Sequence, residues 1–140
     1  MRVLFFKLFS AFILAMFVSS CTTELQENIV GEWKGTDHAE QTASFVFHAD
    51  GNVKMMQGKN VLDSQSVSGS VTWSLDTEKN PMHLTLQIKP AAGGEARDFP
   101  MLVRFVSENQ MQLRMNKEMT PGVPLFSEQD TNNLILLTKQ

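Results

Sequence analysis

The 140-residue chain has little of what most enzyme sites need. It contains one cysteine, Cys21, so no intramolecular disulfide can form. It has no Gly-x-Ser-x-Gly nucleophile elbow, no His-Glu-x-x-His zinc motif and no glycine-rich phosphate loop. Ser68-Gly69-Ser70 is only superficially similar to a serine motif, because strand alternation puts both serines on a polar face. We therefore expect a non-enzymatic protein with no catalytic residues and no cofactor.

Histidine is also scarce, and we expect surface positions for all three: His38, His48 and His83. A histidine-based metal site would require them to converge with a carboxylate such as Asp37 or Asp50. Methionine thioethers can bind copper(I), and Met82-His83 is a suggestive pair, but core filling is the favoured role of the inward methionines. We expect no metal site.

There is no excess of positive charge. Both basic residues of the first twenty positions, Arg2 and Lys7, belong to a segment that is expected to be removed. The remaining chain has ten basic and fifteen acidic residues, a formal charge of −5. This balance argues against binding to nucleic acid.

No apolar run is long enough to suggest a membrane-spanning helix. Positions 8–18 are almost continuously apolar, but a span needs ~20 such residues. The run follows Arg2 and Lys7 and precedes the small residues Ser19 and Ser20. This order predicts a secretory signal over residues 1–20.

The end of this signal, Val18-Ser19-Ser20-Cys21, resembles the lipobox of bacterial lipoproteins. The resemblance implies cleavage before Cys21 and lipidation of its thiol and amine, which would anchor the protein in a membrane. The alternative is an ordinary cleavage site beside a free thiol. Thr22 stands where an inner-membrane retention signal would have Asp, which implies transfer to the outer membrane, facing the periplasm. We expect residues 21–28 to be a polar tether.

From residue 29 onward the pattern is one of successive β-strands. Val67, Val71, Trp73 and Leu75 alternate with polar residues, a period that helices cannot produce. The same alternation at 111–115 places Met111, Leu113 and Met115 inside and Gln112 and Arg114 outside. The spacing predicts an all-β domain over 29–140, a small antiparallel up-and-down barrel of about eight strands. The last strand is apolar on both faces, so we expect it to pair with the first strand and close the barrel.

Five short pieces in order resemble the lipocalin-like, calycin-type domains of bacterial lipoproteins. They are Gly31-Glu32-Trp33, the F-x-x-D-G-x-V pattern at 47–53, and the segments VTWSLD, NPMHLTL and PLFSEQDTNNLILLTK. In lipocalins the first-strand tryptophan closes one end of the barrel and a basic residue of a late strand packs across it. The resemblance thus implies a barrel-closing role for Trp33, with Lys139 or Arg114 as the basic partner.

Two functions follow from such a barrel. A barrel of eight strands is just wide enough to be packed solid or to hold one small molecule. In the first hypothesis a small apolar ligand lies inside; the expected lining is Phe45, Phe47, Trp73, Met111 and Met115, with Phe126 of the long 117–133 segment as a lid. In the alternative the core is solid, there is no small-molecule ligand, and the surface contacts a protein partner of the envelope or inhibits a foreign enzyme.

Overall fold

The computed structural model describes residues 20–37, 39–115 and 134–140. One helix and nine strands follow in order: α1 Ser20–Ile29, β1 Gly31–Thr36, β2 Thr42–Phe47, β3 Val53–Gln57, β4 Asn60–Leu62, β5 Gly69–Asp76, β6 Met82–Pro90, β7 Arg97–Ser107, β8 Gln110–Met115 and β9 Leu134–Lys139. Among these residues no helix is long and apolar enough to cross a membrane.

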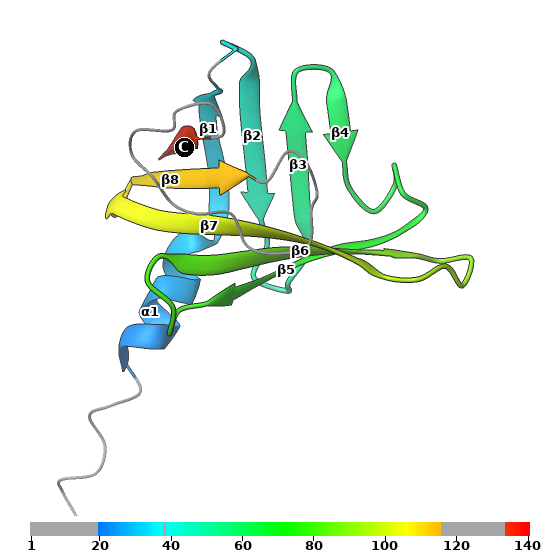
Figure 1. Ribbon diagram of the computed structural model, residues 1–140, viewed down its shortest axis with the longest axis horizontal. Coiled ribbons are helices and arrows are strands. Elements are labelled where there is room, and N and C mark those ends of the chain that lie inside the picture. Colours follow the sequence, from blue (N-terminus) through cyan, green and yellow to red (C-terminus); the bar gives the residue numbers. More distant parts are fainter. Residues whose placement is uncertain (1–19, 38, 116–133) are drawn as a thin grey trace, which may run out of the picture.

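All nine strands belong to one antiparallel sheet with the order β4-β3-β2-β1-β9-β8-β7-β6-β5. Figure 1 shows the first group of strands running across β5 to β8, so that the sheet wraps round a common interior. The last strand lies between β1 and β8, with Gly35 opposite Leu137 and Met111 opposite Leu137 on the other side. The predicted pairing of the two ends of the chain, and hence the antiparallel barrel, is confirmed. The ninth strand is the short β4, which lies at the edge of the sheet.

The barrel is nearly closed rather than fully closed, because β4 and β5 do not form a ladder. The seam is made instead by the β2–β3 turn, where Asn52 forms an isolated bridge with Thr72. The Trp73 amide donates to the Gly51 carbonyl over 2.9 Å. Strand β5 begins later than the sequence pattern predicted. Val67 lies before its first residue, yet the Val67 side chain still packs against the core.

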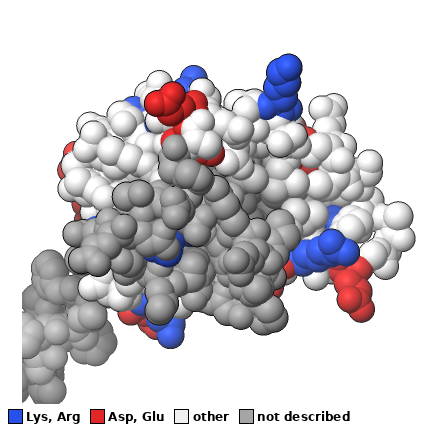
Figure 2. All heavy atoms as spheres, turned by 45° about the horizontal axis from the view of Figure 1, so that its top comes forward, with Lys and Arg blue, Asp and Glu red and all other residues white. Residues whose placement is uncertain are grey.

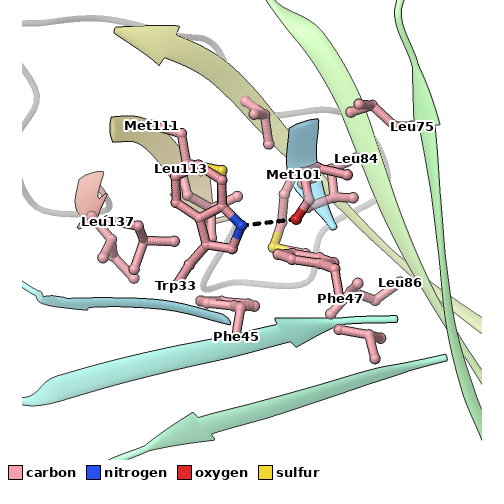
Figure 3. Packing of buried hydrophobic residues seen from close by; sticks show 14 of the residues in the cluster. Trp33, Phe45, Phe47, Leu75, Leu84, Leu86, Met101, Met111, Leu113 and Leu137 are labelled. Atoms are coloured by element: carbon pink, nitrogen blue, oxygen red, sulfur yellow. Dashed lines mark hydrogen bonds between the residues drawn. The ribbon is translucent and has the colours of Figure 1, made fainter. Parts of the chain in front are cut away.

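Alternating side chains of every long strand meet in one apolar core (Figure 3). In β6, Leu84 and Leu86 are buried while Thr85 and Gln87 on the opposite face are not. Arg114 is a correction to the predicted pattern, because it lies on the outer row but is only 7% exposed. The register sets it between Leu102 and Leu134, and the aliphatic stem of an arginine packs well against such neighbours.

The segment expected to be a polar tether is helical, since residues 20–29 form helix α1. Leu25 and Ile29 are spaced by one helical turn, and both pack against the core. Two apolar positions are too few for a recognisable helical stripe, so the pattern alone did not indicate a helix. The helix lies against one end of the barrel, where the Gln26 amide donates to the Leu75 carbonyl over 3.4 Å (Figure 1).

Candidate functional site

Trp33 lies at the end of the barrel that α1 covers. Its side chain has no exposed surface, and its indole Nε1 donates to the Ile29 carbonyl over 2.8 Å, as the dashed line in Figure 3 shows. This bond satisfies the one polar atom of the indole ring, and it holds the last turn of α1 against Trp33. Trp33 thus links the barrel core to the helix.

Lys139 is the basic residue that packs across Trp33. The two residues are cross-strand partners in β9 and β1, and the Lys139 Nζ lies 5.4 Å from the centroid of the Trp33 ring. The same Nζ donates to the Asn28 carbonyl over 2.8 Å, at the carboxyl end of α1, where a cation is favoured. Gly31 leaves room for this stem, because a Cβ there would lie 3.1 Å from Lys139 Cε, and its φ of 131° suits only glycine. Of the two candidates from the sequence, the structure brings Lys139 to this place.

An open groove lies beside this end of the barrel, and we call it the α1 groove. It has a volume of about 600 Å³ and lies between α1 and the turn that joins β7 to β8. Its lining residues are Glu24, Leu25, Glu27, Asn28, Phe105, Ser107, Glu108 and Lys139. Sequence reasoning missed it, because no pattern indicated that α1 would stand opposite this turn.

The α1 groove has an apolar floor and an acidic rim. Leu25 and Phe105 are half-buried and pack against the core. Glu24, Glu27 and Glu108 are exposed. A concave site with apolar walls and a few polar groups is the usual form of a binding site on a protein.

Three of the six residues expected to line an internal ligand site belong to the packed core. Phe45 and Phe47 are 1% exposed and Met111 is 0% exposed. The Phe45 and Phe47 rings stack with centroids 5.8 Å apart. A side chain that borders a void large enough for water keeps accessible surface toward that void. The interior around these three residues is therefore filled.

Trp73 lies at the seam of the barrel. Its indole Nε1 donates to the His48 carbonyl over 2.9 Å, and its ring meets the Phe47 ring edge-on at 5.7 Å. Together with the amide bond to Gly51, these contacts fasten the β2–β3 turn to β5. The half-buried Trp73 thus holds the β2–β3 turn against β5, although no strand ladder joins them there.

The remaining predicted residues are distributed over the molecule. Met115 is half-buried at the end of β8 and packs against the core. Phe126 and His38 lie outside the described residues. His48 is exposed, His83 is half-buried on the outer row of β6, and in the described part of the chain no three His, Cys, Asp or Glu side chains cluster as metal ligands would. Cys21 is the second residue of α1, and its lipidation stays a prediction.

The visible described surface carries its charges singly. Figure 2 shows separate basic and acidic side chains among uncharged ones, with no large area of one sign. A second, shallow groove of about 370 Å³ lies over the outer face of β5, β6 and β7, and its lining is mainly hydroxyl, amide and carboxylate groups: Thr72, Trp73, Ser74, Thr85, Gln87 and Asp98. In it the Gln87 amide donates to Asp98 Oδ1 over 3.1 Å, so two of its polar groups already bind each other.

No protein-family model matches this chain, and no curated protein matches its sequence. Among solved structures it is similar to a DUF4909 family protein from Staphylococcus aureus, with a TM-score of 0.47 and 12% identity over 78% of this chain and 94% of that one. The geometry itself establishes a nearly closed antiparallel β-barrel with a packed interior around Phe45, Phe47 and Met111 and an acidic groove beside Trp33.

Proposed function

We propose that this protein is a lipid-anchored lipoprotein of the bacterial envelope whose lipocalin-like barrel is solid and binds a protein partner on its surface. The proposed role is binding and not catalysis. The observation that carries it is the filled interior, since Trp33, Phe45, Phe47 and Met111 keep at most 1% of their surface. An internal apolar ligand, the other hypothesis from the sequence, would need a void next to these side chains. Binding then falls to the surface, where the α1 groove offers a concave apolar floor.

The position of Cys21 supports the anchored arrangement. Cys21 is the second residue of α1, and the helix ends at Ile29, whose side chain is fully buried. At about 1.5 Å per residue, the eight steps from Cys21 to Ile29 cover only ~12 Å. A lipid on Cys21 would hold the barrel close to the membrane through a helix rather than through a flexible tether.

The anchor is tested by fractionating cells that produce the full chain. Radiolabelled palmitate should label the wild type, and Cys21→Ser should abolish both the label and the membrane association. Thr22→Asp is the matched control, because it keeps Cys21 and, by the resemblance to lipoproteins, should move the labelled protein from the outer to the inner membrane. Membrane association of an unlabelled Cys21→Ser chain would rule out the lipid anchor.

The solid interior is tested with a fluorescent naphthalene sulfonate and with fatty acids as competitors. We expect no stoichiometric binding inside the barrel. Any weak binding in the α1 groove should be lost in Leu25→Gln, which makes the groove floor polar and keeps every fully buried side chain of the core. One fatty acid bound per chain in both the wild type and Leu25→Gln would mean that the interior holds a ligand.

A further inference from the structure

We propose that the α1 groove binds a basic, amphipathic peptide segment of the partner protein, with an apolar side chain on the floor and lysine or arginine against the rim. This inference deepens the proposed function and rests on its surface-binding role. Four features carry it: a fixed floor, a fixed helical wall, an exposed apolar residue between two of the lining residues in the chain, and three carboxylates that have no ion-pair partner among the described residues.

The floor of the groove is held in place from below. The Phe105 ring lies against the Trp33 ring, with centroids 6.1 Å apart, and Trp33 is itself immobilised by its bond to Ile29. Leu25 reaches the same core from the helix side. A floor that is already ordered loses little conformational entropy when a ligand covers it.

The helical wall is fixed at two points along its length. Lys139 binds the Asn28 carbonyl, and the Gln26 side chain binds the Leu75 carbonyl at the end of β5. The distance between α1 and the β7–β8 turn is therefore set by the barrel. The α1 groove is therefore already formed in the protein without a ligand.

The opposite wall contains a β-bulge. The register between β7 and β8 shifts between Phe105 and Ser107, which leaves Val106 without a cross-strand partner. Val106 is 55% exposed, the largest exposure among the bulky apolar side chains of the described residues. Bulges often occur beside binding sites, and the two residues that flank Val106 in the chain, Phe105 and Ser107, both line the groove.

The rim determines the charge of the partner. Within the described residues the ion pairs are Lys34 with Glu32 and Lys54 with Asp63, so none of the rim carboxylates is neutralised. Lys139 is the cation of the groove, and it is already engaged by the Asn28 carbonyl and the Trp33 ring. A positively charged partner would be attracted to Glu24, Glu27 and Glu108 and oriented by them.

A basic peptide fits this arrangement better than a lipid surface does. Anionic lipid headgroups would repel the three rim carboxylates. The aliphatic stem of a lysine or arginine can lie along an apolar floor while its charged end reaches the rim. An adjacent leucine or phenylalanine of the same peptide would cover Leu25 and Phe105.

The experiment uses the full chain, exported by a bacterial host and purified in a non-ionic detergent. The probe is a fluorescein-labelled hexapeptide in which lysine alternates with leucine or phenylalanine, and its binding is followed by fluorescence anisotropy. A peptide with glutamate in place of lysine is the control for hydrophobic contact alone. We expect saturable binding of the lysine peptide only, weakening as salt is raised.

The groove variant is Glu24→Gln with Glu27→Gln and Glu108→Gln. The matched control removes the same charge elsewhere, through Glu40→Gln with Glu95→Gln and Asp98→Asn, all of them exposed residues outside the groove. We expect the dissociation constant to rise about tenfold or more in the groove variant and less than about twofold in the control. Hydrogen exchange should show protection of residues 24–29 and 104–110 when the peptide binds.

Absence of peptide binding, or an equal loss in the two triple variants, would overturn this inference. Neither result affects the filled interior or the lipid anchor, which the fatty-acid and Cys21→Ser experiments test separately. Conversely, a fatty acid bound inside the barrel would overturn the solid-core function even if the lysine peptide also bound to the α1 groove.

Discussion

Lys139 and Trp33 tie the end of the chain to its beginning. They are cross-strand partners, the ammonium lies 5.4 Å from the centre of the indole ring, and it also donates to the Asn28 carbonyl over 2.8 Å. One side chain therefore contacts β1 and α1 from β9. The contact joins the last strand to the first and at the same time fixes the wall of the α1 groove.

Lys139→Met should destabilise the protein by about 1–2 kcal/mol, because it keeps most of the stem but removes the cation from the indole ring and from the helix end. The measurement is urea unfolding followed by tryptophan fluorescence. Lys34→Met is the control: its exposed pair with Glu32 should contribute only about 0.5 kcal/mol. Equal effects of the two substitutions would show that the contact with Trp33 adds nothing.

Trp73→Phe should loosen the seam of the barrel. The substitution keeps an aromatic ring beside Phe47 but removes the donor to the His48 carbonyl, at a cost of about 1–2 kcal/mol. Amide exchange of residues 50–53 should become faster, since that turn is fastened to β5 by Trp73. Phe99→Leu, a half-buried change on β7, should leave exchange in that turn unaltered. Unchanged exchange in Trp73→Phe would contradict this account of the seam.

Gly35→Ala should separate β1 from β9. A Cβ at Gly35 would overlap the Leu136 carbonyl oxygen and lie 3.2 Å from Leu137 Cδ2, and backbone atoms cannot move aside as a flexible side chain can. We expect a loss of about 3 kcal/mol in thermal or urea unfolding. Gly94→Ala is the control, because its Cβ would meet only the Pro90 ring, at 3.2 Å or more. A Gly35→Ala protein as stable as Gly94→Ala would show that the close approach of the strands is not required.

Asp50 should make the β2–β3 turn sensitive to acid. The hydrogen bond that its carboxylate accepts from the Asn52 amide, at 2.9 Å, is the main cause that lowers the pKa of Asp50 below its ordinary value of 3.8. The carboxylate therefore stabilises the turn fully above this value. The contribution is lost as the pH falls below 3.8 and through the lower pKa of the folded protein.

A carboxyl NMR titration would measure the pKa of Asp50, and the exchange rate of the Asn52 amide would report on the turn. Asp50→Asn should remove the acid-dependent change in exchange at this site. A pKa of Asp50 above 3.8 would contradict the proposed hydrogen bond.

Much of the barrel could be predicted because strand pattern is local. The alternation in β5 and β8 already separated Val71 and Leu113 from their polar neighbours, and the structure buries both. The apolar last strand indicated a central place in the sheet, and Leu137 lies there opposite Gly35. In each case the burial of one face follows from the two-residue period of a strand.

The site could not be predicted in the same way. Leu25 and Ile29 gave too weak a stripe to indicate a helix, and their packing depends on the barrel end that the helix covers. The outer-row position of Arg114 was correct, but its burial depends on neighbours in two other strands. Trp73 was expected to line a cavity, whereas its bonding partners come from a turn more than twenty residues away.

The sequence by itself determined the strand periods, the turns and the charge balance, because these depend on residues next to one another along the chain. Only the tertiary structure decided that the interior around Phe45 and Met111 is filled, since packing density depends on how many strands converge and how closely. It alone also brought Glu24 and Glu108 to one groove. Their separation of more than eighty residues is bridged by the fit of α1 against one end of the barrel.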